Sequence, residues 1–152
     1  MNVEEVMNRK VHTCRPEDSL KVPAKLMWEQ DVGCIPVVDL ETRPVGMITD
    51  RDICMSCYFT GKALDQQDVR QAMARKVHAA RLGQSVESAE ELMGSKQIRR
   101  LPVVDKSGKL VGILSVNDLA LAAGEERAVK SDEVAATLAS ICQPRHRAAP
   151  AA

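Results

Sequence analysis

Two short apolar runs separated by a polar turn occur twice along the chain. The first set is IPVVD and PVGMIT, within residues 35–49, and the second set is LPVVD and KLVGILS, within residues 101–115. Four or so residues join the two runs of each set, and the second joint, DKSG, is rich in turn formers. Short apolar runs joined in this way are typical of β-hairpins. The pattern therefore predicts two hairpins.

The hairpins belong to a longer internal repeat with a period of 66 residues. Residues 7–55 align on residues 73–121 without a gap, and the identical pairs include Pro36 with Pro102 and Asp52 with Asp118. A fixed period in a sequence indicates a repeated structural unit. We infer that a gene duplication produced two copies of one fold.

Further elements surround each hairpin in the same order. An amphipathic stretch, VEEVM or VRQAM, predicts a short turn of helix, and the following VHTC or VHAA predicts a first short strand. A helix with Ser19 or Ser85 as its N-cap comes next. Pro23 removes an early hydrogen bond from the first of these helices. A second helix follows each hairpin and begins near Asp50 or near Val116.

Each copy thus has the order β-α-β-β-α. A unit of fewer than about 60 residues buries too little surface to be comfortably stable alone. We therefore predict an α/β (α+β) fold in which two pseudo-symmetric β-α-β-β-α repeats pack as one module. A pseudo-twofold axis between the repeats would make any cleft at their seam occur twice.

The predicted boundaries divide the chain into two domains, a linker and a C-terminal part. Residues 1–60 form the first domain, residues 61–68 a polar linker, and residues 69–125 the second domain. Residues 126–142 contain a last helix with Ser131 as N-cap, and Asp132 and Glu133 lie near the positive end of its dipole. Residues 143–152 have little to bury and are expected to be disordered.

Composition excludes several partners. The chain has 152 residues, of which 45% are hydrophobic but only 2% aromatic, so it offers no stacking platform for single-stranded nucleic acid. The 21 acidic residues balance 21 Lys and Arg residues, so no overall basic field attracts nucleic acid or a membrane surface. No apolar run reaches the roughly 18 residues of a membrane span. With an N-terminus unlike a signal peptide and an odd set of five cysteines, the expected compartment is the cytoplasm.

Each hairpin ends with a hydroxyl residue that is followed three positions later by a carboxylate. Thr49 with Asp52, and Ser115 with Asp118, stand where a strand gives way to a helix. One interpretation is structural, because this is a capping-box variant that satisfies the helix N-terminus. The other is functional, because free N–H groups at a helix N-terminus bind anions and a carboxylate accepts hydrogen bonds from two adjacent hydroxyls. A phosphate and a ribose fit such a pair.

A glycine precedes each of these phrases. Gly46 and Gly112 lack a Cβ, so a ligand or a neighbouring backbone can approach the strand closely there. The same glycines could instead serve only the bend of the strand.

The doubled phrase resembles a tandem pair of CBS domains, the unit called a Bateman module. The resemblance rests on IPVVD with PVGMITDRD and on RLPVVD with LVGILSVND, and it covers residues 3–123. It implies a pseudo-symmetric α/β module that binds AMP, ADP, ATP, NAD or S-adenosylmethionine in clefts between the copies. It also implies a homodimer in which two modules meet through their helices.

The resemblance, together with charge in the case of Arg51 and Arg99, assigns residues to the two clefts. In each cleft the hydroxyl faces phosphate, the Asp holds the ribose, and the other copy supplies backbone and apolar contacts. The cleft of Asp52 is then expected to contain Met47, Thr49, Arg51, His78, Ile98 and Arg100. The cleft of Asp118 is expected to contain His12, Val32, Cys34, Arg99, Ile113 and Ser115. Because the second copy has two arginines where the first has Gly33 and Cys34, the clefts should differ.

Other chemical signals are weaker. Cys54 and Cys57 form a C-x-x-C, but a zinc site needs about four ligands, and a redox dithiol would stand at a helix N-terminus. His12 and His78 occupy matching positions in the predicted first strands, without sequence partners for a metal or a general base. The sequence has no Walker loop, G-x-G-x-x-G or Ser-His-Asp order, so we expect neither a metal site nor an enzyme.

Three classes of function remain. A nucleotide-sensing regulatory module that signals to a separate effector protein explains the duplication, both hydroxyl-carboxylate phrases and the missing catalytic residues. A ligand-free structural or dimerising scaffold is the alternative, and a thiol-based redox or metal protein is the third. The sequence does not choose among AMP, ADP, ATP, NAD and S-adenosylmethionine, because all share adenosine.

Overall fold

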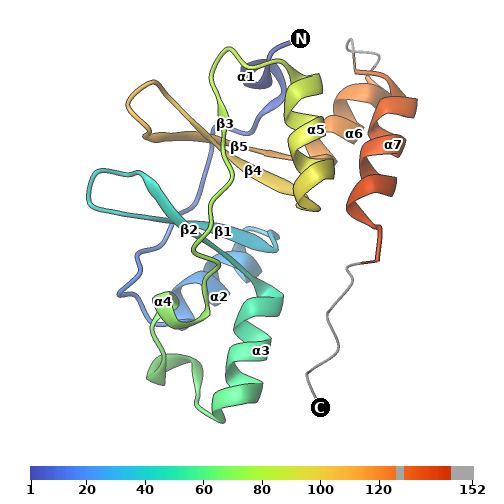
Figure 1. Ribbon diagram of the computed structural model, residues 1–152. Coiled ribbons are helices and arrows are strands. Elements are labelled where there is room, and N and C mark those ends of the chain that lie inside the picture. The colour runs from blue at the N-terminus through green and yellow to red at the C-terminus, as the bar shows by residue number, and fades with distance from the viewer. Residues whose placement is uncertain (126–128, 145–152) are drawn as a thin grey trace.

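The structure, a computed structural model, describes residues 1–125 and 129–144 (Figure 1). It confirms a mixed α+β fold in which a short helix, a longer helix, a hairpin and a second helix occur twice, whereas a third strand is added to the second sheet only. In chain order these are α1 (Val3–Val6), α2 (Lys21–Glu29), β1 (Cys34–Val38), β2 (Pro44–Thr49), α3 (Asp50–Thr60), a 3-10 helix (Leu64–Gln66), α4 (Val69–Ala72), β3 (Ala80–Arg81), α5 (Val86–Lys96), β4 (Arg100–Val104), β5 (Leu110–Ser115), α6 (Val116–Gly124) and α7 (Ser131–Ile141).

Both predicted hairpins are present and share one register. Strand β1 pairs antiparallel with β2, so that Cys34 lies opposite Thr49, and β4 pairs antiparallel with β5, so that Arg100 lies opposite Ser115. The predicted second helices, α3 and α6, begin directly after these hairpins, as expected. The ends of the two hairpins therefore place equivalent residues at equivalent helix N-termini.

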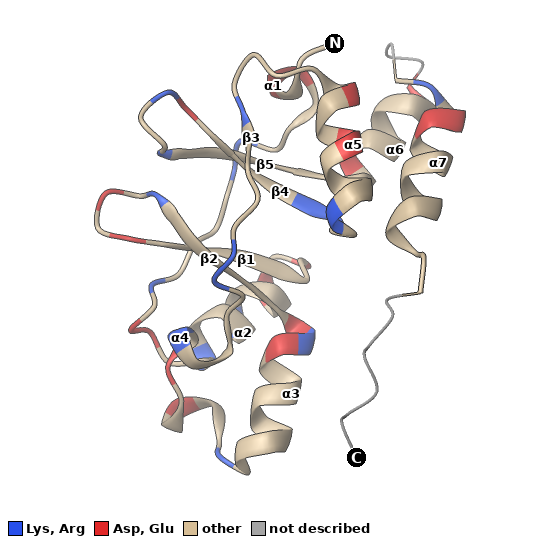
Figure 2. Ribbon diagram, viewed as in Figure 1, with Lys and Arg blue, Asp and Glu red and all other residues tan. Residues whose placement is uncertain are grey.

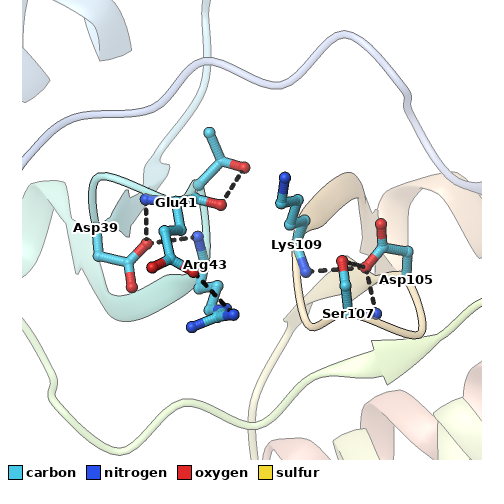
Figure 3. A network of polar contacts seen from close by, with 7 residues as sticks. Asp39, Glu41, Arg43, Asp105, Ser107 and Lys109 are labelled. Carbon is cyan, nitrogen blue, oxygen red and sulfur yellow. Dashed lines mark hydrogen bonds and ion pairs between the residues drawn. The ribbon is translucent and has the colours of Figure 1, made fainter.

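An aspartate closes each hairpin turn (Figure 3). Asp39 and Asp105 each accept hydrogen bonds through Oδ1 from the backbone N–H groups two and four residues further along, at 2.8–3.0 Å. Short polar side chains stabilise turns in this way. The second turn has Gly108 with φ +82°, and the first has Thr42 with φ +61°, which is uncommon for a residue with a Cβ. The Leu110 N–H donates to the Thr42 carbonyl at 2.9 Å, so the two hairpins touch.

The opening helices are exchanged between the two halves of the module. We call residues 21–60, with α2, β1, β2 and α3, the first half, and residues 80–124, with β3 to α6, the second half. Val3 of α1 packs in the core of the second half, whereas Val69 of α4 packs in the core of the first half. Figure 1 shows α1 beside α5 and α4 beside α2. Each sequence copy thus lends its first helix to the other copy.

The segments that follow these short helices cross between the sheets. Residue Asn8 exchanges two backbone hydrogen bonds of 2.9 Å with Ile113 of β5, and Cys14 then pairs with Val37 of β1. In the second crossing segment Ala74 pairs with Met47 of β2, and β3 then pairs in parallel with β4. Both sheets are therefore joined to both copies of the sequence.

The predicted first strands are largely wrong for this reason. Instead of a strand over residues 11–14 there is one bridge at Cys14, and instead of a strand over residues 77–80 there is β3 at Ala80–Arg81. The two ends of each segment belong to different sheets, so no continuous ladder can form between them. His12 and His78 lie in these crossing segments and not in strands.

Gly46 and Gly112 admit a neighbouring segment of this chain rather than a ligand. A Cβ on Gly46 would clash with the sulfur of Met73 and lie 3.1 Å from the Ala74 carbonyl oxygen. A Cβ on Gly112 would meet the sulfur of Met7 in the same way. Of the interpretations offered by the sequence, close approach of a neighbouring backbone is the one that the structure supports.

Of the three N-cap serines predicted outside the hairpin ends, one is correct. Ser85 caps α5, since its hydroxyl accepts from the Ser88 N–H at 3.2 Å. The predicted cap at Ser19 is wrong, because the N-cap of α2 is Leu20. Pro23 has no N–H to bond the Ser19 carbonyl, so the first i to i−4 hydrogen bond of the helix runs from the Ala24 N–H to the Leu20 carbonyl.

The third predicted cap, Ser131, was also wrong. The extended residue before α7 is Lys130, and its carbonyl accepts from the Val134 N–H at 3.1 Å, so Ser131 is already helical. The predicted helix over residues 126–142 is thus observed as Ser131–Ile141. Residues 126–128, and residues 145–152 of the predicted disordered tail, lie outside the described residues.

Helix α7 packs against α5 and α6 of the second half (Figure 1). Its buried face consists of Val134, Thr137 and Ile141, which recur at helical spacing. Across residues 1–125 and 129–144, none of the helices has the length and apolar character needed to cross a membrane.

Candidate functional site

The two hydroxyl-carboxylate phrases form matching capping boxes. Asp52 Oδ2 accepts hydrogen bonds from the Thr49 N–H at 2.9 Å and from the Thr49 hydroxyl at 2.8 Å, and the Asp52 N–H donates back to that hydroxyl at 3.1 Å. In the second half, the corresponding distances between Ser115 and Asp118 are 2.7, 2.6 and 3.2 Å. The structural interpretation of these phrases is therefore correct in both halves.

The same geometry leaves one carboxylate oxygen available in each half. Within the part of the chain that the structure describes, the hydrogen bonds that the carboxylates of Asp52 and Asp118 accept all run through Oδ2. Both side chains are half-buried at a helix N-terminus. The cap fixes each carboxylate in place, while Oδ1 can still accept hydrogen bonds from a diol.

Arg100 reaches from the second half to the first. Its Nη2 and Asp50 Oδ2 lie 3.6 and 3.3 Å from the point that a Cβ on Gly33 would occupy. Figure 2 shows basic residues at the start of β4 and acidic residues at the start of α3. The structure thus brings Arg100 close to the start of the helix that carries Asp52.

Cys34 lies at the same place. It faces Thr49 across the first hairpin and is buried, and burial raises the pKa of its thiol to about 11 even though the charge of Arg100 acts in the opposite direction. The carboxylates of Asp52 and Asp50 also raise this pKa. The sequence had assigned Cys34 to the cleft of Asp118, and that assignment stays a prediction.

The remaining predicted residues lie on several elements. Met47 and Ile113 are half-buried in mid-strand, with their backbones bonded to the crossing segments. Ile98 packs against the core of the second half. His12 and His78 are half-buried, and burial, together with Lys76 and Lys96, lowers the pKa of His78. Three predicted residues are exposed, namely Val32, Arg51 and Arg99.

Sequence reasoning missed a cavity of about 520 Å³ between α2 and α3. Met27 and Ile53 are its most buried lining residues, and Trp28, Asp31, Asp50 and both thiols of the C-x-x-C also line it. Val32 is the one predicted site residue in this lining. A signal was available, because Trp28 stands at the position where the second copy has Gly94.

A smaller cavity lies at the seam between the halves. Its volume is about 170 Å³, and it is lined by the first crossing segment and by both hairpins. The lining residues are Arg9, Val11, Thr13, Val38, Thr42, Leu110 and Val111. None of them belongs to the predicted clefts.

All five cysteines are free, and Cys54 and Cys57 lie inside α3 rather than at its N-terminus, as predicted. Among the described residues, no three His, Cys, Asp or Glu side chains are grouped closely enough to hold a metal ion.

The family model described as "CBS domain" matches residues 3–57 and residues 68–125. The chain belongs to the CBS domain family. The predicted tandem pair is confirmed, since two CBS domains account for most of the chain and the solved structures that resemble it are CBS domain pairs.

Two relatives show how much of the chain is shared. It is 38% identical over 120 residues to the CBS domain-containing protein YhcV of Bacillus subtilis, which covers 79% of this chain and 84% of YhcV. It is 35% identical over 119 residues to the uncharacterised protein MK0525 of Methanopyrus kandleri. The match covers 78% of this chain but 61% of the Methanopyrus protein, so this chain spans only part of the length of that relative.

Two solved structures share the fold and contain ligands. CBSX2 in complex with AMP has 28% sequence identity and a TM-score of 0.71, and the match covers 83% of this chain and 98% of CBSX2. The CBS domain pair of MJ0100, in complex with 5-methylthioadenosine and S-adenosyl-L-methionine, has 25% identity and a TM-score of 0.71. This match covers 80% of this chain and 98% of the MJ0100 pair.

Proposed function

We propose that this chain is a regulatory module that binds an adenosine-containing nucleotide of the AMP, ADP and ATP class between its two CBS domains. The bound state is then passed to a separate effector protein, and the chain itself is not an enzyme. NAD and S-adenosylmethionine share the adenosine and are further candidate ligands.

The matched pair of capping boxes is the observation that carries this proposal. Asp52 and Asp118 are held by their own helix caps in the same orientation, and each keeps one carboxylate oxygen for a ribose diol. The helix N-termini beside them favour a negatively charged phosphate. Two proteins with this fold, CBSX2 and MJ0100, are complexes with adenosine compounds.

The charges at the two helix N-termini support unequal clefts. Arg100 lies near Asp50 at the start of α3, and its guanidinium can donate a bidentate pair of hydrogen bonds to a phosphate. The equivalent position in the first copy is the buried Cys34. The cleft of Asp52 therefore has a cation that its counterpart must obtain from Arg99, an exposed residue.

Signalling requires that the ligand bind one arrangement of the module better than another. We propose that the module acts as a homodimer, as the CBS resemblance implies, and that it does so in the cytoplasm, as the N-terminus and the cysteines suggest. Five free thiols are compatible with a reducing compartment. Energy sensing is the regulatory role that an AMP and ATP ligand class would give it.

The main test is a thermal melt with AMP, ADP, ATP, NAD and S-adenosylmethionine, each added separately. A ligand that binds the native state must raise the melting temperature. If none of the five does so, the module is a structural scaffold in which both capping boxes serve only their helices.

Calorimetry on variants then locates the ligand. Asp118→Ala should weaken the binding of the active nucleotide at least tenfold, about 1.4 kcal/mol, if this carboxylate holds the ribose. The same measurement on Asp52→Ala decides whether the first cleft is also used. Because both changes also remove a helix cap, Ser85→Ala is the matched control, which loses a cap far from either phrase and should bind normally. Unchanged affinity in both Asp variants contradicts the proposed site.

A further inference from the structure

Cys54 and Cys57 lie on one side of α3 and line the same cavity. They stand three residues apart inside the helix, and helical neighbours at this spacing have Cβ atoms about 5–6 Å apart. The cavity is the one of about 520 Å³ between α2 and α3. In the second copy the corresponding positions of α6 are Ala120 and Ala123. The thiol pair thus distinguishes the first half from the second.

These two thiols are accessible to solvent, unlike Cys14 and Cys34. Cys54 is exposed and Cys57 is half-buried, whereas Cys14 and Cys34 are buried. Burial raises the pKa of the Cys14 thiol to about 12 and that of the Cys34 thiol to about 11. Because a metal ion binds the thiolate form, the raised pKa values oppose metal binding by the two buried cysteines.

A buried amide is directed at the sulfur of Cys57. The Gln67 side chain, in a residue only 2% exposed, donates from Nε2 to Cys57 Sγ at 3.6 Å. The same nitrogen donates to the Lys62 carbonyl at 3.1 Å, and the amide oxygen accepts from the hydroxyls of Ser56 and Thr60 at 2.7 and 3.1 Å. These bonds fix the amide, which in turn orients the sulfur as outer-shell hydrogen bonds orient metal ligands.

Met27 brings a third sulfur to the lining of this cavity. It belongs to α2 and is 8% exposed. Among the described residues, no His, Asp or Glu completes a group of three with the two cysteines. The sulfur donors at the cavity are therefore two thiols and one thioether, which are soft ligands.

The spacing of the thiols favours an ion between the sulfurs over a disulfide. A disulfide needs Cβ atoms about 3.5–4.5 Å apart, whereas helical neighbours at this spacing have them about 5–6 Å apart. With metal–thiolate bonds of about 2.3 Å, two sulfurs on one ion can stand up to about 4.6 Å apart. Zinc needs about four ligands, which is why the sequence predicted no metal site. Cu(I) selects thiolate and thioether sulfur and accepts as few as two donors.

We propose that Cys54 and Cys57 bind one Cu(I) ion, with Met27 as a third and weaker donor. The copper arrives already reduced, as a Cu(I) complex. Each thiol loses its proton and forms one Cu–S bond, so two protons are released, no electron is transferred and the site gains one negative charge. The thioether adds no charge. This site is separate from the capping box of Thr49 and Asp52, and it does not depend on nucleotide binding.

The test is an anaerobic titration of the reduced, nucleotide-free protein with the coloured Cu(I) complex of bicinchoninate, which loses its colour as the protein takes the ion. The wild type should take one ion per chain. Cys54→Ser and Cys57→Ser should each weaken binding at least about hundredfold, because losing a ligand costs more than losing an outer-shell partner. Cys142→Ser, at an exposed thiol next to α7, is the matched control and should bind as the wild type does.

Met27→Leu tests the third donor, since it keeps the volume of the buried side chain and removes only the sulfur. It should weaken Cu(I) binding about tenfold, which is less than either cysteine variant. Unchanged affinity would remove Met27 from the site.

Ultraviolet absorption gives an independent signal. A thiolate-to-copper absorption should grow up to one equivalent and be missing in the double variant Cys54→Ser with Cys57→Ser. The proposal is overturned if the wild type takes no copper, if two chains share one ion, if the double variant binds as tightly as the wild type, or if Cys142→Ser abolishes binding. Circular dichroism of each variant verifies folding. The nucleotide melts are scored separately, so a failure of either idea leaves the other testable.

Discussion

The first and second halves of the module have equivalent hairpins and capping boxes, but only the helix pair of the second half is covered by another helix. In the second half, α7 closes the surface of α5 and α6. In the first half, the surface of α2 and α3 is open, contains a cavity and presents Trp28. Duplication thus preserved the local geometry that positions the two Asp residues, whereas the outer surfaces diverged.

The largest expected change in stability comes from loosening α7, the helix that packs on α5 and α6 of the second half. Ile141→Ala should lower the free energy of unfolding by about 2–5 kcal/mol, because it empties a buried site between α7 and the core. Urea denaturation measures the change. Val22→Ala, on the open helix α2, is the control and should alter stability by no more than about 0.5 kcal/mol. Equal effects of the two variants would show that α7 is not seated on the second half.

The next effect compares the two crossing segments. Gly112→Ala and Gly46→Ala each force a methyl group against a methionine from the other sequence copy and should cost about 1–3 kcal/mol. Gly112→Ala should be the worse of the two, because Met7 is buried whereas Met73 is partly exposed and has more room to move. Thermal denaturation measures both.

Gly124→Ala is the control for this pair, because a Cβ there would meet no atom within 4 Å. It should cause no loss of stability. If Gly46→Ala and Gly112→Ala are also tolerated without loss, then the crossing segments do not pack as closely as the structure shows.

The smallest effect is the pH dependence of Glu90, whose counterpart in the first copy is Ala24. Burial beneath α7 raises the pKa of Glu90, and the nearby carboxylates of Glu133 and Glu87 add to this, while the Thr137 hydroxyl acts against it. A raised native pKa means that the folded state binds the proton more tightly than the unfolded state. Its contribution to stability is therefore present at low pH and is lost as pH rises through the native pKa.

Glu90→Gln should accordingly have a higher melting temperature than the wild type at pH 7, and the difference should vanish in acid, below the ordinary pKa of a glutamate. Glu87→Gln is the control of opposite sign, because hydrogen bonds lower the pKa of this exposed carboxyl and its contribution is lost as pH falls. Melts from pH 4 to pH 8 decide the matter. A Glu90→Gln variant without any gain at pH 7 would contradict the raised pKa.

The parts of the fold that depend on local sequence could be predicted. The hairpins, the start of α3 and α6 and the cap at Ser85 each depend on residues within a few positions of one another, so short patterns were sufficient. The phrase with Thr49 and Asp52 shows the same for the site, because its cap geometry is made by neighbours in the chain. Even the misplaced cap at Ser19 had a visible local cause in Pro23.

The parts that depend on distant contacts could not be predicted. The crossing segments pair at their two ends with different sheets, and nothing near His12 or His78 in the sequence encodes this. The position of α7 and the cavity beside Trp28 likewise depend on how separate helices pack. Which predicted side chains converge on each cleft is a question of the same kind, and the approach of Arg100 to the first half is the part that the structure answers.

The exchange of α1 and α4 has a mechanical consequence. Neither CBS domain can be cut from the chain at the linker without leaving its core open where the other domain's helix belongs. The module should then behave as one interlocked body that melts in a single cooperative step. The two crossing segments also tie one sheet to the other by continuous backbone, because each pairs with a different sheet at its two ends.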